Sequence, residues 1–223
     1  MSAPASARVS VALHSYWHCG TGRGASAMLD AVIARDALGL PVLPGRSLRG
    51  LLREAVETLA EIGAEVGGRP LPADAASILF GTSGFETVPG AARPRANRGT
   101  VPGRLAVSDA RLEPAALAHL AHLDAEERAV LARTLVTTLA ATAIDDHGSA
   151  KAATLRTVEA AVPVGLEARI DLLPPPPGAS AAALALAERW LDVLVAAAPF
   201  VRAVGGGRTR GLGRCTLALS EAA

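Results

Sequence analysis

The sequence is poor in several residue types, and each scarcity restricts what the protein can be. Only two of its 223 residues are cysteine, too few for a disulfide framework. Aromatic residues make up 3%, so stacking of a ligand on exposed rings is not expected to dominate recognition. No apolar run is long enough to span a bilayer, and the first residues lack the basic and apolar regions of a signal peptide. We therefore expect a cytoplasmic protein with no membrane partner.

Lysine is almost absent, because Lys151 is the only one and every other basic side chain is an arginine. The net charge is only +1, so the protein as a whole does not attract polyanions. The arginines nevertheless cluster in two segments without acids, "RPRANRGTVPGR" at 93–104 and "GGGRTRGLGR" at 205–214. Positive loops on a neutral body indicate a defined site for an anion rather than an adhesive surface.

The glycine-rich segment 205–214 does not fit the known nucleotide-cofactor loops. Its glycines follow an apolar helical run and precede a strand-like run, whereas a Rossmann loop follows a strand and opens a helix. It also lacks the Gly-Lys-Ser/Thr of a Walker loop. Glycine permits close backbone approach to a ligand, and arginine pairs with phosphate through two hydrogen bonds. The candidate phosphate-binding residues are Gly205, Gly206, Gly207, Arg208 and Arg210. The alternative is a mobile surface turn whose arginines serve solubility.

A second candidate lies in "LPVLPGRSLRGLLREA" at 40–55. It places Arg46, Ser47 and Arg49 at the start of a predicted helix, with Ser47 as the expected N-cap. Free N–H groups and the helix dipole favour an anion at that end. If this loop and the glycine-rich loop approach the same region of a sheet, they form a continuous track for phosphates.

The hydrophobic pattern predicts one α+β domain over residues 1–223. Alternation and apolar stripes predict strands at 7–17, 103–112, 153–173 and 214–221, and helices at 44–68, 113–123, 124–142 and 181–199. Asp124 and Glu127 have the spacing of a capping box. Without the insertions at about 18–43, 68–102 and 113–155, the order is β-α-β-β-α-β. This order is that of the ferredoxin-like, RRM-like fold, with four antiparallel strands and two helices on one face.

Four motifs, in this order along the chain, resemble those of the repeat-associated mysterious proteins (RAMPs), the RNA-binding superfamily of CRISPR effector complexes. Segment 40–55 resembles their Pro-Gly-x-Ser-Leu-Lys/Arg-Gly motif. "ILFGTSG" at 78–84, followed by "GRLAVSDARL" at 103–112, resembles their Phe-Gly segment and second strand. "TLRTVEAAVPVGLEARI" at 154–170 is similar to the thumb hairpin and following strand of type III backbone subunits, which places a thumb at about 145–165. "GGGRTRGLGRC" at 205–215 resembles their glycine-rich loop.

The resemblance implies a backbone subunit of a type III-like antiviral effector that binds guide (CRISPR) RNA along its phosphates. Its partners would be target RNA, other RAMP subunits and a large effector subunit. Lys151 and Arg156, next to the thumb, would contact RNA as well. With few aromatic side chains, we expect binding through phosphate and ribose that is neutral to sequence.

The resemblance also places a catalytic aspartate between the first strand and the Pro-Gly motif, where Asp30 matches. It would cut target RNA as a metal-dependent endoribonuclease with Mg²⁺ or Mn²⁺, and no organic cofactor is expected. Asp36 is the other acid in this loop and has the surroundings of a turn. The alternative for Asp30 is that it only caps a short helix. In the same loop the family's His-x-Gly-Gly is replaced by "HCGTGRG", beginning at His18.

Two further side-chain groups have open interpretations. His18, Cys19 and Cys215 could approach one another across neighbouring strands, but without a Cys-x-x-Cys pair we expect Cys215 to be a buried apolar residue and no metal site. In "IDDHGSAKAATLR" at 144–156, a histidine beside two acids could act in acid–base chemistry or could lie on a solvated loop tip. The alternative functions are a guide-processing endonuclease of the same superfamily and a non-catalytic structural subunit.

Overall fold

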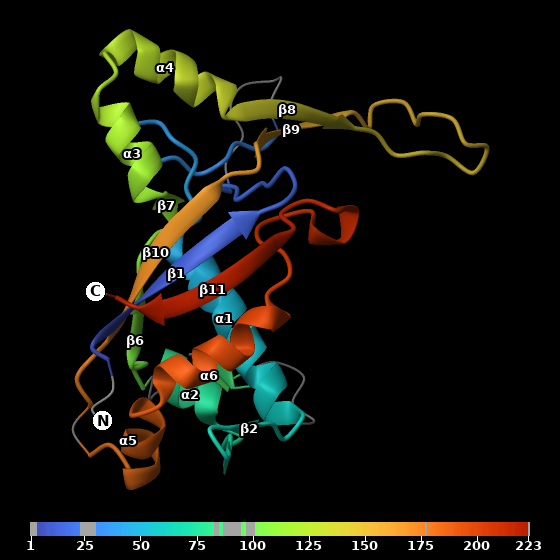
Figure 1. Cartoon of the computed structure of the whole chain (residues 1–223). Helices are drawn as coiled ribbons and strands as arrows, with labels where there is room; N and C mark the ends of the chain where they lie inside the picture. Colours follow the sequence, from blue (N-terminus) through green and yellow to red (C-terminus); the bar gives the residue numbers. More distant parts are fainter. Residues whose placement is uncertain are drawn as a thin grey trace.

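The structure is a computed structural model that describes residues 4–22, 30–82, 101–176 and 178–222, together with the backbone of 85–86 and 95–96. Its centre is an antiparallel sheet in which the strands follow the order β11-β1-β10-β6, and the short β7 also pairs with β10 (Figure 1). The bounds are β1 Ser6–Leu13, β6 Leu105–Val107, β7 Arg111–Leu112, β10 Gly165–Leu172 and β11 Cys215–Glu221. The protein is thus a mixed α/β protein in which the last strand, β11, lies at the edge of the sheet beside the first strand, β1.

The sheet has one buried face and one open face, as the alternation in the sequence predicts. In β1 the side chains of Val9 and Val11 are buried, whereas those of Arg8, Ser10 and Ala12 face solvent. The same alternation continues in β10, where Leu166, Ala168 and Ile170 are buried, and in the first half of β11, where Cys215 and Leu217 are buried. A one-residue shift in register would turn all of these apolar side chains to water, which fixes the pairing of the strands.

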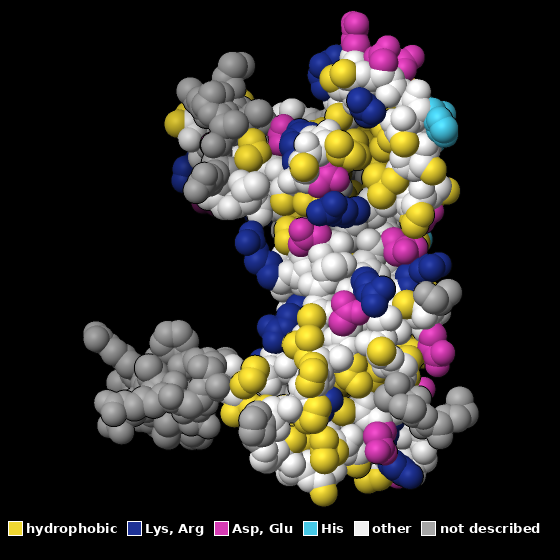
Figure 2. Space-filling view, turned by 90° about the vertical axis from the view of Figure 1, so that its left-hand side faces the viewer, with side chains coloured by type: hydrophobic (Ala, Val, Ile, Leu, Met, Phe, Trp, Pro, Cys, Tyr) yellow, Lys and Arg dark blue, Asp and Glu magenta, His cyan; other side chains and the backbone are white. Residues whose placement is uncertain are grey.

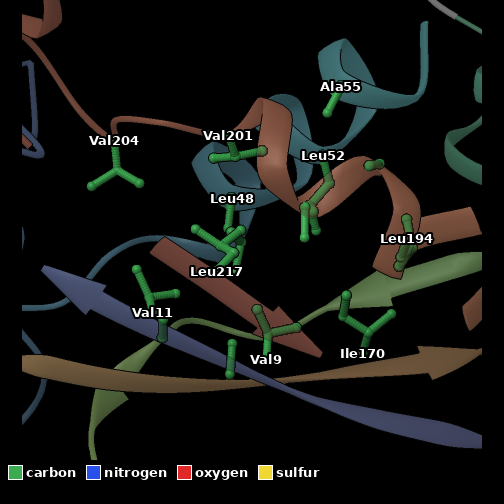
Figure 3. Packing of buried hydrophobic residues seen from close by; sticks show 14 of the residues in the cluster. Val9, Val11, Leu48, Leu52, Ala55, Ile170, Leu194, Val201, Val204 and Leu217 are labelled. Atoms are coloured by element: carbon green, nitrogen blue, oxygen red, sulfur yellow. The ribbon is translucent and has the colours of Figure 1, made fainter. Parts of the chain in front are cut away.

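Helices α1 (Gly45–Glu61) and α6 (Trp190–Ala197) cover the buried face. The sequence predicts an apolar stripe on this helix, formed by Leu48, Leu51, Leu52, Ala55, Val56 and Leu59. The prediction is confirmed, because all of these residues except Leu51 are buried. Figure 3 shows Val9, Val11, Ile170 and Leu217 of the sheet pointing toward α1. Two shorter helices, α2 (Ala75–Phe80) and α5 (Ala181–Ala187), and the 3-10 turn η1 (Ala198–Phe200) complete this layer.

Several predicted elements end or break earlier than the sequence indicated, and the helix expected over 181–199 is divided into α5 and α6. The helix expected over 44–68 stops at Glu61, and Gly67 and Gly68 make the positive-φ turn between strands β2 (Glu65–Val66) and β3 (Arg69–Pro70). The strand expected over 103–112 is interrupted between β6 and β7, where Asp109 turns to accept a hydrogen bond from the first residue of α1. Strands β4 (Phe85–Glu86) and β5 (Arg95–Ala96) pair within the insertion.

The helical prediction for 113–142 is right in its first two thirds and wrong in its last third. Helices α3 (Pro114–Ala121) and α4 (Ala125–Thr134) are present, and the capping box of Asp124 and Glu127 is confirmed. The residues after α4 instead form strand β8 (Val136–Ala141), which pairs along its whole length with β9 (Arg156–Ala161). Pairing with a strand distant in sequence overrides the weak local preference for helix.

The hairpin of β8 and β9 extends away from the sheet (Figure 1). The hairpin expected at about 145–165 therefore begins earlier, at Val136. Its tip is held by its own polar groups, because the Asp145 carboxylate accepts hydrogen bonds from the N–H groups of His147 and Ser149, both at 2.9 Å. The Thr154 hydroxyl donates to the Lys151 carbonyl at 2.7 Å. Among the described residues, no helix is both long and apolar enough to cross a membrane.

We predict that Leu52→Ala destabilises the protein by roughly 2–5 kcal/mol, since Leu52 is fully buried between α1 and the sheet and alanine leaves a cavity. Denaturant unfolding followed by circular dichroism measures this change. Leu38→Ala is the control, because Leu38 is 60% exposed and its loss should change the free energy of unfolding by no more than about 0.5 kcal/mol. Equal effects of the two substitutions would contradict this description of the core.

Candidate functional site

The glycine-rich loop 205–214 packs against the chain that follows β1. Gly206 donates its N–H to the His18 carbonyl at 2.7 Å, and Gly213 donates to the Tyr16 carbonyl at 2.7 Å. Gly205 has a φ of +76°, and a Cβ there would lie 2.2 Å from the His18 carbonyl oxygen. Gly205 is therefore required for packing within the chain. From the sequence alone, this glycine was expected to permit close approach of a ligand.

The arginines of this loop remain available to solvent. Arg208 and Arg210 bound the 3-10 turn η2 (Arg208–Arg210), and both are exposed. Arg208 makes one long contact with Glu54 of α1, at 3.8 Å, in which both side chains are exposed. Such a contact contributes little and yields readily to a stronger anion. Arg202 and Arg208 also line a groove of about 600 Å³ between this loop and α1.

The start of α1 differs from the predicted anion site. The helix begins at Gly45 with Pro44 as its N-cap, so the prediction of Ser47 as N-cap is wrong. The Gly45 N–H donates to the Asp109 carboxylate at 2.7 Å, and Ser47 N–H donates to the Pro44 carbonyl at 2.8 Å. An internal carboxylate thus takes the place at which the sequence predicted an external phosphate.

The two arginines predicted at this helix end differ in their surroundings. Arg49 donates to the carbonyl of Phe80 and lies 6.0 Å from the centre of its ring. It thereby stabilises the carboxyl end of α2, where partial negative charge accumulates. Arg46 is exposed, and no partner for it occurs among the described residues. Of this pair, Arg46 is the side chain free to meet an anion.

Arg46 and the glycine-rich loop 205–214 lie at different positions along the axis of α1. The glycine-rich loop meets the helix at Glu54, eight residues after Arg46. At about 1.5 Å per residue this separates the two positions by roughly 12 Å along the helix axis. The structure therefore brings Arg208 to the middle of α1 rather than to its amino end.

Asp30 lies against the base of the hairpin. Its backbone N–H donates to the Thr157 carbonyl at 2.9 Å, and its carboxylate accepts from the Thr157 N–H at 2.7 Å. The next residue, Ala31, continues this pairing along β9 with Val158. Asp30 is exposed, and its carboxylate binds the N–H of a strand rather than the end of a helix.

Asp36 has the turn role that its surroundings predicted. Its carboxylate accepts hydrogen bonds from the N–H groups of Leu38 and Leu40, at 2.9 and 3.0 Å. Sequence reasoning missed Glu159 of β9, whose carboxylate accepts from the Ile33 N–H at 3.1 Å and pairs with Arg35 at 3.2 Å. A single acid in an extended segment has no local signal for such a role.

Both cysteines are buried as free thiols. Burial raises the pKa of the Cys19 thiol to about 12 and that of Cys215 to about 11. Thiols are metal ligands only as thiolates, which burial disfavours here. His18 uses Nδ1 for a 2.6 Å contact with the Glu159 carbonyl. Within the part of the chain that the structure describes, no three histidine, cysteine or acidic side chains form a metal-binding group.

The remaining predicted residues lie on the hairpin or in the insertion. Lys151 is exposed near the tip, close to the turn that Asp145 forms, and Arg156 is exposed at the first position of β9. In the segment 93–104, Arg93 and Arg98 lie outside the described residues, and for Arg95 the backbone alone is described. Arg104 is only 7% exposed, so its assignment to a surface cluster is wrong.

We predict that Gly205→Ala destabilises the protein more than Gly211→Ala does. Both glycines have positive φ, +76° and +85°, so each alanine costs about 1–2 kcal/mol of backbone strain. At Gly211 the new Cβ meets open space, whereas at Gly205 it meets the His18 carbonyl and must displace backbone. Denaturant midpoints of the two variants compare these costs, and equal midpoints would show that the loop does not pack as described.

The chain matches a known protein family and resembles chains of many solved structures. The family model described as the RAMP superfamily matches residues 11–216. A chain of the structure "Cryo-EM structure of the Type III-B Cmr-beta bound to cognate target RNA" is similar with a TM-score of 0.63 and 11% identity, over 96% of each chain. A chain of "Type III-B Cmr-beta Cryo-EM structure of the Apo state" is similar with a TM-score of 0.59 and 11% identity, over 97% of each chain. No curated protein matches the chain in sequence.

Proposed function

The chain belongs to the RAMP superfamily, and from this premise we propose that it is a subunit of a type III-like CRISPR effector complex that binds guide RNA along its phosphates. One observation carries the proposal. His18 joins the glycine-rich loop, through its carbonyl and Gly206 at 2.7 Å, to the hairpin base, through its ring and Glu159 at 2.6 Å. A loop with exposed arginines and a projecting hairpin are thereby held at one end of the sheet.

In this proposal the sheet with α1 and α6 is a ferredoxin-like core, and the β8–β9 hairpin is the thumb. The support for the core is its antiparallel strand order β11-β1-β10-β6. Helix α1 lies between β1 and β6 in the sequence and α6 lies between β10 and β11, so the strands of the two units alternate in the sheet. The support for the thumb is that Ile144 and Leu155, near its tip, are 61% and 68% exposed. Apolar side chains on a projecting hairpin are expected to contact bases or a neighbouring subunit.

Recognition through phosphate and ribose follows from the open face of the sheet. Its outward positions in β1 and β11 are small or polar, including Ser10, Ala12, Thr216 and Ala218. Arg8 on this face is paired with Glu167 at 3.3 Å. Bases therefore find no stacking platform on these strands, and the unpaired arginines of the loops would supply sequence-neutral affinity.

We predict that replacing Arg208 and Arg210 together with alanine weakens RNA binding regardless of sequence. Each lost phosphate contact should reduce the slope of log affinity against log salt by roughly 0.7 for single-stranded RNA. Fluorescence anisotropy with a labelled oligonucleotide over a salt series measures both quantities. The control is Arg8→Ala with Arg169→Ala, which removes the same charge from the open face, where both arginines are paired with acids.

The expected control result is an unchanged slope. If the control weakens binding as much as the loop variant does, the RNA contacts the sheet face instead. If neither variant changes binding, the glycine-rich loop does not contact RNA.

Target cutting at Asp30 is the finer part of the proposal. Asp30 lies on the loop beside the hairpin base, where a displaced target nucleotide would be presented. Among the described residues Asp30 belongs to no group of three or more acidic, histidine or cysteine side chains, so Mg²⁺ or Mn²⁺ would take most of its ligands from phosphates and water. Such an ion would neutralise charge on the reacting phosphate. Asp30 itself would hold it or orient the ribose 2′-hydroxyl.

One observation favours a scaffold without cutting activity as the second candidate. The Asp30 carboxylate already accepts a hydrogen bond from the Thr157 N–H at 2.7 Å, so it also has a structural role. Asparagine retains an oxygen acceptor for this bond but loses the negative charge. Comparison of Asp30→Asn with Asp30→Ala therefore separates the two roles.

We predict that both Asp30→Asn and Asp30→Ala abolish metal-dependent cutting of a target paired to the guide while guide binding is retained. The assay uses reconstituted complex with magnesium or manganese and analysis of the product ends, for which a cyclic phosphate is expected. Asp36→Asn is the control, because that carboxylate serves a turn. Cutting by Asp30→Asn at the unaltered rate would contradict catalysis by this residue, and an inactive complex that still binds target would identify a scaffold.

A further inference from the structure

Arg104 is the one charged residue that is buried among those the structure describes. Its Nη1 is inaccessible to solvent and has no hydrogen-bond partner. It also forms no ion pair with a described carboxylate. A buried guanidinium without an anion is unfavourable, because its desolvation is not offset by a charged partner. Such a group in a native fold calls for an explanation beyond packing.

The guanidinium is held in place by its surroundings. The Arg104 Nε donates to the Leu173 carbonyl at 2.8 Å, and the Leu173 N–H donates back to the Arg104 carbonyl at 2.7 Å. On the other side, the Arg104 N–H donates to the Leu79 carbonyl of α2 at 2.9 Å. The preceding Gly103 lies so close to α2 that a Cβ would meet the Phe80 backbone at 2.4 Å. The arginine is therefore oriented before any ligand arrives.

Arg104 lines a cavity of about 380 Å³ between α2, α5 and the segment that precedes β6. Apolar side chains form most of the lining. They include Ile78 of α2, Ala183 of α5, and Val101 of the segment before β6. A mostly apolar cavity of this size with one oriented charge is typical of a ligand site. Asp74 also contributes to the lining without pairing with Arg104.

We propose that this cavity, named the Arg104 cavity, binds a carboxylate carried on an apolar segment of a partner protein. The carboxylate would form charge-assisted hydrogen bonds with the part of Arg104 that lines the cavity and would supply the negative charge that the guanidinium lacks, and the apolar flanks would fill the remaining space. An RNA backbone fits this site less well. It needs several cations, whereas here a single arginine shares the lining with Asp74.

The position of the cavity agrees with a protein partner rather than with guide or target RNA. Helices α2 and α5 lie at the end of the molecule opposite the β8–β9 hairpin (Figure 1). Figure 2 shows hydrophobic side chains gathered over this lower end. Leu173, next to Arg104, is 40% exposed, and Leu184 of α5 is 42% exposed. Exposed apolar side chains that gather in a patch are typical of a surface that binds another protein.

The test uses the full chain and two peptides that differ in one charge, acetyl-Leu-Glu-Leu-amide and acetyl-Leu-Gln-Leu-amide. Isothermal titration or amide chemical shifts measure binding, and we expect the glutamate peptide to bind at least about tenfold more tightly, as a charge-assisted pair allows. Arg104→Met should abolish this preference. Ala183→Phe, which fills the cavity without altering Arg104, should abolish binding of both peptides. Ala182→Phe places the same ring on the same helix at a residue outside the lining and should change neither result.

Circular dichroism establishes that each variant is folded, and Ala183→Phe keeps the test decisive if Arg104→Met does not fold. Equal binding of the two peptides would overturn the proposal, as would absence of binding or a preference that survives Arg104→Met. A third probe, oligouridylate, distinguishes the anion source. Competition by oligouridylate against the glutamate peptide would show a phosphate site and would also overturn the proposal. None of these outcomes depends on whether the glycine-rich loop binds RNA.

Discussion

The arrangement at the end of β1 depends on one close backbone contact, between Gly205 and the carbonyl of His18. A side chain at Gly205 would collide with that carbonyl, so the contact exists only because this residue is glycine. The same His18 carries the hydrogen bonds that join the glycine-rich loop to the base of the hairpin. Backbone contacts, together with the His18 ring and the Asp30 carboxylate, therefore fix the positions of Asp30, the arginine loop and the hairpin relative to one another.

The sheet supports this arrangement because it is buried on one face alone. Helices α1 and α6 supply the apolar layer, and the other face keeps its charges in local pairs such as Arg8 with Glu167. Exposed arginines that form no ion pair with a described residue include Arg46 in the first turn of α1, and Arg202 and Arg210 in the loops before β11. A protein with a net charge of +1 can thus present an anion site without attracting polyanions over its whole surface.

Much of the fold could be predicted from periodicity, but several side-chain roles could not. Alternation in β1 and the stripe of α1 are local signals, and both elements are present as expected. The residues of β8 were assigned to a helix because their partner, β9, is about twenty residues away and leaves no trace in the local pattern. Arg49 and Arg104 were taken as exposed for a similar reason, since their acceptors are backbone carbonyls of distant segments. Arginine clusters in sequence therefore mix surface and interior residues.

Because the chain has a single lysine, reagents that act on lysine can report on one place in the fold. Lys151, the single lysine of the chain, lies exposed at the tip of the β8–β9 hairpin. A lysine-specific protease therefore has one site in the entire polypeptide, and an amine-reactive dye has one side chain to modify. Cleavage there would leave two fragments that the paired strands and the sheet still hold together. The rate of that single cut would report whether an RNA strand or a neighbouring subunit covers the tip.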